Sequence, residues 1–394
     1  MTSFRYPSLL DETPEEFGRW IREVSRIRDD DIIDGDAVNE LINGRLETVS
    51  LTPAASQNNY YLGIKGANSV QSTAKISPTV TMKITGILAT GVLDGKILRI
   101  VNAGSQTAAS SRLLLLERES ASSDAANRLN WPPGYPPIML MPGDWAQFEY
   151  DITSTRWRYT TGTRNFMSIR GNFDEFCDQM GVGASPFTTS STGVGAGIAN
   201  GTYLGGDTTE RTMGAVEVVT GTDTTGRSYL TSGDTLTMFT GGCFLYACRA
   251  VANTTLSDGT ERYQIRCGFH DASSGTDAVD GAYWEYDDSV SGDWRTVTSS
   301  NSTKTKTTVT GFTVSVTVYH TLGIFVNYDG TQVDYFYMTG GDAVTVAGTS
   351  HTTNIPPNTR YFGVAAGINK TAGTTSRRAD FDWVGFRTQV KRGA

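Results

Sequence analysis

Apolar side chains follow a helical repeat near the amino terminus and alternate along much of the remaining chain. Residues 13–16, Thr-Pro-Glu-Glu, have the form of a capping box with proline at the first helical position. A helical stripe then runs to the acidic residues 29–31, and it consists of Phe17, Trp20, Ile21, Val24 and Ile27. The pattern predicts one short helix within a segment of residues 1–46.

This helix cannot bury its apolar stripe alone in water. It either docks on its own chain or contacts another subunit, and the scarcity of other helical patterns favours a subunit contact. We therefore expect an attachment or trimerisation surface made of Phe17, Trp20, Ile21 and Val24.

From residue 47 to 160 the pattern changes to short segments separated by Gly, Pro, Asn and Ser. Val80, Met82 and Ile84 alternate as in a strand with one buried face. The sequence predicts one antiparallel β module with strands at 78–87, 96–102, 112–117, 138–141, 145–150 and 155–159.

Residues 161–206 are rich in Gly, Ser and Thr, and this composition predicts a connector. A larger β domain, residues 207–394, follows. In its segment 262–269, one face carries Tyr263, Ile265, Cys267 and Phe269, and the other carries Arg262, Gln264 and Arg266. Further strands are predicted at 242–250, 283–286, 294–298, 312–318, 322–328, 333–338, 361–368 and 381–387. Nine or more strands without a helical pattern predict a sandwich or jelly roll, so the fold class is mainly β.

Composition and charge reduce the number of function classes that the chain can have. The net charge of −8 argues against nucleic-acid binding, which needs a basic face. Neither a basic, apolar leader nor an apolar run of membrane-spanning length is present, so we expect a protein made in a cytoplasm with no membrane partner.

The cysteine pattern gives no support for a zinc site, because no close pair of cysteines exists. Cys243 and Cys248 face opposite sides if they share a strand. Reduced, buried thiols are the expectation, and a Cys243–Cys267 disulfide is the alternative.

Within the second domain, residues 241–288, Gly-Gly-Cys-Phe-Leu-Tyr through Glu-Tyr-Asp-Asp, resemble concanavalin A-like lectin/glucanase sandwiches of bacteriophage appendage proteins. Supporting stretches are Asp293-Trp294, 307–311, 322–331, 355–357, 373–377 and 380–386. The resemblance implies a concanavalin A-like β-sandwich.

The first β module also resembles a recurrent phage fibre module, on residues 97–104, 123–128, 141–144 and 153–158. This resemblance implies a small β-sandwich or jelly roll that assembles as a homotrimer. The sequence departs from it at residues 131–137, an aromatic–proline insertion with Trp131 and Tyr135. That insertion is either a contact surface or an idiosyncratic turn.

Together the resemblances imply a trimeric virion protein of a phage or phage-like particle, made in the host bacterial cytoplasm. A head- or tail-attached fibre or spike would bind host surface glycans through its distal lectin-like domain. The alternative is a capsid decoration or cement protein, and the third is a glycan hydrolase. The expected partners are itself, other capsid or tail proteins and a glycan.

Catalysis is the least supported of these functions. The glucanases of this fold carry Glu-x-Asp-x-x-Glu on one strand, and here Glu285 and Asp287 match but Val290 replaces the second glutamate. We therefore expect no enzyme and no catalytic residue. Glu285 and Asp287 are interpreted as carboxylates facing water or as polar ligands in a sugar groove.

Sugar binding needs aromatic faces and a few polar hydrogen-bonding groups. Most aromatic residues are expected in the core, among them Tyr263, Phe269, Tyr335 and Trp383. The candidate carbohydrate site at hairpin ends consists of Trp284, Asp287, Asp288, Asp293 and Trp294, with a packed corner as the alternative. No cofactor or metal is expected. Oxygen ligands for calcium could come from Asp277, Asp280, Asp287 and Asp288, but EF-hand spacing is absent.

Overall fold

A computed structural model describes most of residues 46–390. The residues that it does not describe are 1–45, 63–70, 133–136, 164–172, 176–187, 201–214, 233–238, 240, 253, 272–276, 288–290, 341–342, 349 and 391–394. The predicted helix and its surface of Phe17, Trp20, Ile21 and Val24 therefore lie outside the described residues. Elsewhere strands dominate, which confirms a mainly β fold.

The first module consists of a six-stranded and a three-stranded sheet packed face to face. The three-stranded sheet runs β3 (Met82–Ile84), β5 (Leu114–Leu116), β7 (Ile138–Leu140). The six-stranded sheet runs in the order β1 (Leu46–Leu51), β2 (Gln71–Ile76), β4 (Ile97–Asn102), β8 (Trp145–Asp151), β9 (Arg156–Gly162) and β6 (Leu129–Asn130). Its pairing is mixed: β1, β2 and β4 are parallel, whereas β4, β8 and β9 are antiparallel. The prediction of a purely antiparallel module was wrong.

Alternating strand residues fill the core of this module. Ile76 and Leu98 from the larger sheet meet Ile84, Leu114 and Leu140 from the smaller one. Trp131 is also in this core and is only 3% exposed. Its indole packs inward, which corrects the expectation that Trp131 belongs to an exposed contact surface. Tyr135 lies outside the described residues.

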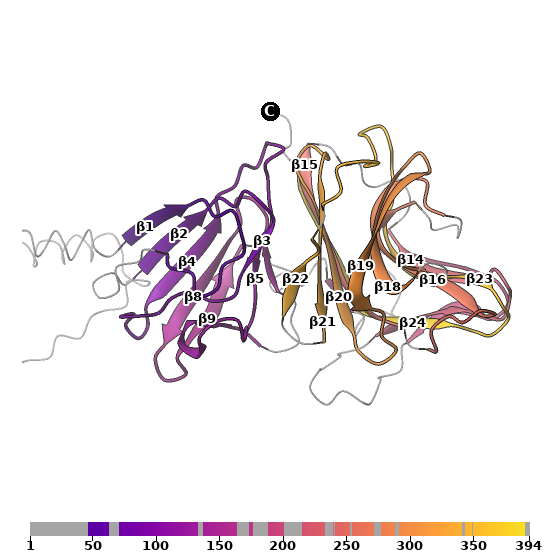
Figure 1. Cartoon of the computed structure of the whole chain (residues 1–394), viewed down its shortest axis with the longest axis horizontal. Helices are drawn as coiled ribbons and strands as arrows, with labels where there is room; N and C mark the ends of the chain where they lie inside the picture. Colours follow the sequence, from indigo (N-terminus) through magenta and orange to yellow (C-terminus); the bar gives the residue numbers. More distant parts are fainter. Residues whose placement is uncertain are drawn as a thin grey trace, which may run out of the picture.

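The second module is a sandwich of a seven-stranded and an eight-stranded sheet, which form the right-hand part of Figure 1. The seven-stranded sheet runs β11 (Thr188–Thr192), β14 (Arg227–Thr231), β23 (Gly363–Ala372), β16 (Arg262–His270), β17 (Gly281–Asp287), β18 (Ser291–Ser300) and β19 (Thr303–Thr313). The other sheet runs β12 (Ala196–Asn200), β13 (Val216–Thr220), β24 (Arg378–Val390), β15 (Gly242–Val251), β20 (His320–Val326), β21 (Val333–Thr339) and β22 (Val344–Val346), and β10 (Phe173–Glu175) pairs with β24.

Three of these strands come from the segment that composition assigned to a connector. β10, β11 and β12 lie within residues 161–206 and pair with β24, β14 and β13. The connector prediction is corrected for these strands, because their backbone hydrogen bonds are completed by strands distant in sequence. Local apolar alternation is therefore not needed to hold them.

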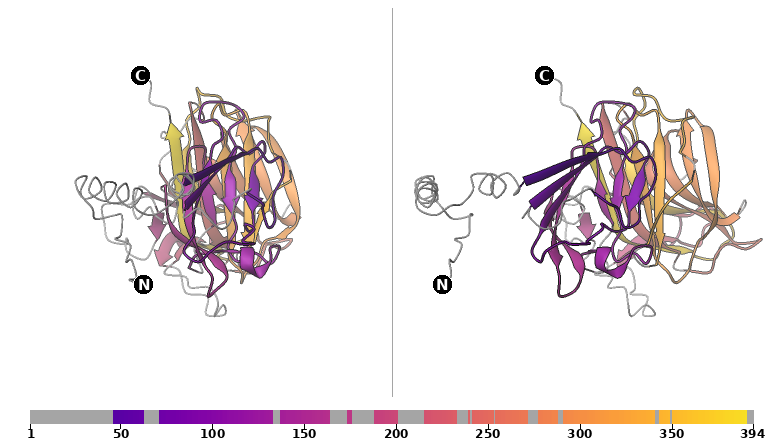
Figure 2. Two further views of the ribbon diagram at one scale, coloured as in Figure 1. Left: turned by 90° about the vertical axis from the view of Figure 1, so that its left-hand side faces the viewer. Right: turned by 60° about the vertical axis from the view of Figure 1, so that its left-hand side comes forward.

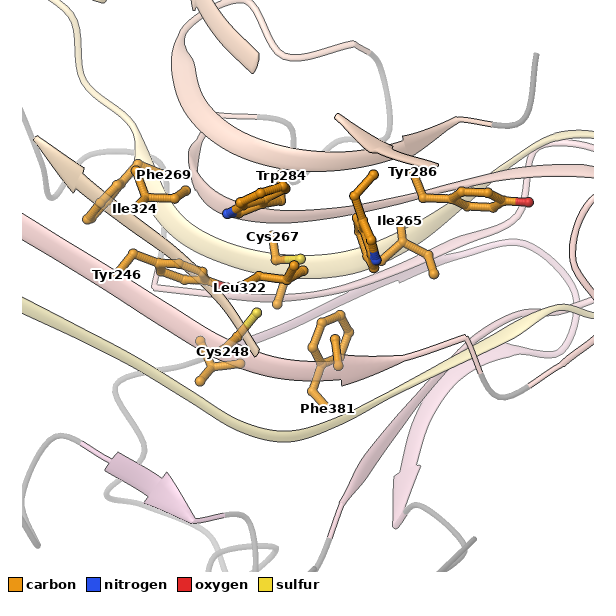
Figure 3. Packing of buried hydrophobic residues seen from close by; sticks show 14 of the residues in the cluster. Tyr246, Cys248, Ile265, Cys267, Phe269, Trp284, Tyr286, Leu322, Ile324 and Phe381 are labelled. Atoms are coloured by element: carbon orange, nitrogen blue, oxygen red, sulfur yellow. The ribbon is translucent and has the colours of Figure 1, made fainter. Parts of the chain in front are cut away.

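The space between the two large sheets is filled by aromatic and aliphatic side chains (Figure 3). Tyr263, Ile265, Cys267 and Phe269 all point into it, as their alternation predicted. Cys248 and Cys267 approach each other across this core (Figure 3). Cys243 lies on the opposite face of β15, so the proposed Cys243–Cys267 disulfide is wrong and both thiols are free.

The two modules share a third core. Leu113, Leu115 and Met139 of the first module pack against Leu245 and Phe336 on the outer face of the eight-stranded sheet. The views in Figure 2 agree that the first module lies directly against the sandwich. The modules therefore dock through an extended apolar surface.

Polar contacts fix this docking. Arg387 of β24 donates two hydrogen bonds of 2.6 Å to the carboxylate of Asp144. Lys83 pairs with Glu117 at 2.8 Å and also donates to the carbonyl oxygen of Val344. Such bidentate and charge-assisted bonds set the register of two surfaces as well as holding them together.

Most predicted strands are present, but one was placed wrongly. A strand was expected at 312–318, whereas the strand here, β19, covers Thr303–Thr313. Its Thr-Lys-Thr-Lys pattern has few apolar residues and gave no strand signal. No helix in the described part of the chain is long and apolar enough to cross a membrane.

Candidate functional site

Three of the four faces of the two large sheets are covered. The inner faces bury the sandwich core, and the outer face of the eight-stranded sheet is covered by the first module. The outer face of the seven-stranded sheet is the remaining one, and it lies on the side away from the first module (Figure 1).

Strand register brings one row of residues together across this face. Tyr229 pairs with Gly367, Gly367 with Arg266, Arg266 with Glu285, and Glu285 with Arg295. Gly367 is required here because a Cβ would lie 2.3 Å from the Tyr229 ring. The row thus aligns one phenol and three charged side chains from four separate strands.

Glu285 is the centre of this charge cluster. Its Oε2 accepts a hydrogen bond of 2.9 Å from Nε of Arg266, and its Oε1 accepts one of 2.9 Å from Lys306. Arg295 donates to the same Oε1 and, at 2.9 Å, to Asp287. Three cations therefore converge on one fully buried carboxylate.

Two further residues extend the cluster toward solvent. Asp277 accepts from Arg266 and pairs with Lys304 at 2.6 Å. We call the whole set the outer-face cluster: Arg266, Asp277, Glu285, Asp287, Arg295, Lys304 and Lys306. Four cations thus face three carboxylates, which leaves a positive excess on a chain of net charge −8.

The same charges keep Glu285 ionised. Burial acts to raise the pKa of Glu285, but the charges of Arg266 and Lys306 outweigh it and hold the pKa below its usual value. The pKa of Asp277 is lowered in the same way, with burial opposed by Arg266 and Lys304. These carboxylates therefore act as fixed negative charges that orient the cations.

Buried polar atoms without partners adjoin the cluster. The hydroxyl of Tyr283 and Nε of Arg295 have no hydrogen-bond partner among the described residues. Arg227, on the same face of β14, forms no ion pair with any described residue and also leaves its Nε unpartnered. Such groups cost free energy when buried, so they favour a ligand or water that completes their hydrogen bonds.

Residues 278–279, just before β17, form a short strap that covers one end of this face. Ala278 packs on Tyr283 and Val297, and Ser299 donates hydrogen bonds to the carbonyl oxygens of Ala278 and Val279. The strap shields Tyr283, while Asp277 remains more than half exposed. Access to the cluster is therefore from the side of Asp277 and Lys306.

Of the predicted carbohydrate-binding residues, the two tryptophans are core residues. Trp284 donates from Nε1 to the carbonyl oxygen of Gly323 at 3.0 Å, and Trp294 donates to Nδ1 of His320 at 2.8 Å. Both side chains are fully buried between the sheets, which corrects their assignment to an exposed sugar platform. The alternative of a packed corner describes them better, because Trp284 on β17 and Trp294 on β18 both face the core between the sheets.

The predicted aspartates have separate positions. Asp287 belongs to the outer-face cluster, whereas Asp288 lies outside the described residues. Asp293 accepts hydrogen bonds from Thr313 and the Gly311 amide and thereby ties β18 to β19. The interpretation of Glu285 and Asp287 as carboxylates facing water is wrong, because both are buried and paired with cations. Sequence reasoning missed these cations, whose only signal was the polar alternation of the strands.

The cluster lacks the pair of carboxyl groups that glycoside hydrolysis needs. A general acid must hold its proton near neutral pH, which requires a raised pKa. Glu285 and Asp277 have lowered pKa values, and Asp287 is paired with Arg295. The arrangement therefore binds charge more readily than it transfers a proton.

The aspartates considered for calcium do not converge. Asp277 and Asp287 are paired with cations of the cluster, and Asp280 accepts a hydrogen bond from the Asn301 amide. Among the described residues no group of three potential metal ligands occurs.

Comparison with known proteins gave one match to a family model, within the second module. Residues 211–382 match the family model described as the C-terminal domain of SO2946-like proteins. Comparison with curated proteins gave no match.

Solved structures similar to this chain include lectins, a glycoside hydrolase and alginate lyases. A GH131 β-glucanase catalytic domain from Podospora anserina shares 11% identity and a TM-score of 0.36, over 56% of this chain and 92% of that one. A seed lectin from Lotus tetragonolobus shares 10% identity and a TM-score of 0.33, over 52% and 100%. An alginate lyase from Klebsiella pneumoniae shares 10% identity and a TM-score of 0.33, over 45% and 83%. Because these scores and identities are low, no function is transferred from them.

Proposed function

We propose that the C-terminal sandwich binds an acidic glycan on the outer face of its seven-stranded sheet and does not cleave it. The observation that carries the proposal is the excess of cations in the outer-face cluster, next to buried polar atoms without partners. Guanidinium groups are suited to carboxylates because they donate in a planar fork.

The position of the cluster supports binding to an extended ligand. The cations of the cluster come from β16, β18 and β19; Lys304 and Lys306 of β19 are partly exposed, whereas Arg266 and Arg295 are buried. Arg227 on β14, two strands away from β16 on the same face of the sheet, adds a further cation. A glycan that approaches from the side of Asp277 and Lys306 would meet the partly exposed lysines first.

Binding to acidic glycans tests the proposal. We would measure affinity for oligogalacturonate, oligomannuronate and oligosialic acid with the wild type and with Lys306→Gln and Arg227→Gln. Each variant is expected to lose about tenfold in affinity, because a charge-assisted hydrogen bond contributes roughly 1.5–3 kcal/mol. Lys75→Gln removes the same charge from an exposed site on β2 of the first module and should bind like the wild type. Binding to none of the three acidic glycans would refute the proposal.

The biological setting is a second part of the proposal. We propose a trimeric virion protein, a head- or tail-attached fibre or spike with the sandwich outermost, or else a capsid decoration protein. This part rests on the sequence resemblance alone. Immunogold labelling of intact particles tests it: labelled projections support a fibre, a uniformly labelled shell supports decoration, and unlabelled particles contradict both.

A further inference from the structure

The two long edges of the sandwich differ. At one edge, β11 and β12 are joined by the tight turn of residues 193–195, which closes the gap between the sheets. At the other edge, β19 ends the seven-stranded sheet and β22 ends the eight-stranded sheet, with no turn between them. Residues 351–354 bridge part of this edge, because His351 pairs with Val333 of β21 and Thr353 and Asn354 hydrogen-bond to Thr305 of β19. The rest of the edge, between β19 and β22, is open.

This open edge contains a hollow of about 280 Å³. It is lined by Thr296, Thr307, Thr308, Val309, Thr310, Tyr337, Thr345, Val346, Ala347 and Gly348. Five threonines and one tyrosine present hydroxyl groups, and none of the described lining residues is charged. The hollow is thus lined by uncharged residues, whereas the outer-face cluster consists of charged ones.

The floor of the hollow is a neutral hydrogen-bond network. Nε2 of His351 lies 3.0 Å from the Thr296 hydroxyl and 3.1 Å from that of Thr307, and Nδ1 lies 3.0 Å from Thr298. Burial lowers the pKa of His351 to about 4, so the imidazole is uncharged at neutral pH. The threonines of the floor are held in fixed positions by this ring.

The rim has hydroxyl groups free for a ligand. Thr310 and Thr345 are exposed, and neither side chain hydrogen-bonds to a described residue. Val309 and Ala347 lie beside these hydroxyls and offer apolar contact. A surface that mixes hydroxyls and small apolar groups matches the hydroxyl and C–H groups of a sugar ring.

We propose that this edge hollow binds one neutral sugar unit. Its volume is slightly below the ~300–1,000 Å³ of pockets for drug-sized ligands, so it suits a single ring rather than a chain. The absence of charge among its described lining residues disfavours a uronate, whose carboxylate would find no cation there. This second site uses residues that the acidic-glycan proposal does not use.

Methyl glycosides of glucose, galactose and mannose are suitable probes, with saturation-transfer NMR for contact and titration for affinity. Thr310→Val and Thr345→Val keep the side-chain shape and remove a hydroxyl. Each is expected to weaken binding by about three- to tenfold, the value of one hydrogen bond. Thr303→Val makes the same change on β19 outside the hollow and should leave affinity unchanged.

The outcomes separate the two proposals. Loss of methyl-glycoside binding in the Thr310 and Thr345 variants, with acidic-glycan binding intact, supports the edge hollow. Binding to none of the probes, or binding that Lys306→Gln weakens more than Thr345→Val, overturns it. Failure of the acidic glycans alone would refute only the charged site.

Discussion

At the scale of single residues, Glu285 determines the geometry of the outer-face cluster. It is fully buried, yet Arg266, Arg295 and Lys306 all donate to it. An ion pair removed from water is costly to break, because the remaining charges lose their compensation. Glu285 therefore has a structural role, and of the three cations around it Lys306, whose side chain is 29% exposed, can contact a ligand.

We predict that Glu285→Gln lowers the free energy of unfolding by about 3 kcal/mol, since two buried arginines and the partly exposed Lys306 lose their common counter-ion. Urea denaturation measures this change. The matched control is Glu217→Gln. Its carboxylate pairs at 3.2 Å with Arg378, whose side chain is half exposed, so this variant should lower the free energy of unfolding by less than about 1 kcal/mol. Equal costs in the two variants would show that the cluster does not depend on Glu285.

The three histidines predict a dependence of stability on pH. Burial lowers the pKa of His270 to about 3 and those of His320 and His351 to about 4. Between pH 6.5 and 5 the unfolded chain binds protons that the folded chain does not, so stability falls as the pH falls. The expected slope is roughly 1.4 kcal/mol per pH unit for each histidine. Free energies of unfolding measured at pH 7 and pH 5 test this, and equal values would contradict it.

At the scale of elements, β5 and its flanking Leu113 connect the two modules. Leu114 and Leu116 face the core of the first module, whereas Leu113 and Leu115 face the sandwich. A run of four leucines without polar alternation is typical of a strand that is covered on both faces. The docking of the modules is thus encoded in this short segment.

We predict that Leu115→Asp uncouples the modules, because it buries an unpaired charge in their shared apolar surface. Scanning calorimetry should show one transition for the wild type and two for the variant, and limited proteolysis should release the modules separately. Leu93→Asp introduces the same charge at a residue that is 57% exposed and should keep one transition. A single transition in both variants would indicate that the shared core contributes little.

The strands show which parts of the fold could be predicted from the sequence and which could not. Alternation correctly predicted the inward face of β16, and the predicted strand 283–286 includes Glu285 but ends one residue before Asp287, the last residue of β17. It missed β19 because threonine and lysine replace apolar residues there, and it missed β11 and β12 because distant strands hold them. The cations of the outer-face cluster were also missed, since only strand pairing brings Arg266 and Arg295 to Glu285.

At the scale of the whole molecule, the first module covers one side of the sandwich and leaves the charged sheet face on the other (Figure 1). The resemblance to trimeric fibre modules predicts that the full chain assembles as a homotrimer. Light scattering coupled to size-exclusion chromatography should then give about three times the chain mass of 42.6 kDa. A mass of one chain at micromolar concentration would contradict the trimer.

The central claim is that the outer face of the seven-stranded sheet recognises negative charge on a glycan. The most direct measurement is calorimetric titration of the full chain with an acidic oligosaccharide and with its methyl ester, which has the same rings but no charge. We predict that the free acid binds, that its affinity falls as salt screens the charges, and that the ester binds at least about tenfold more weakly. Equal affinity for acid and ester would contradict the account.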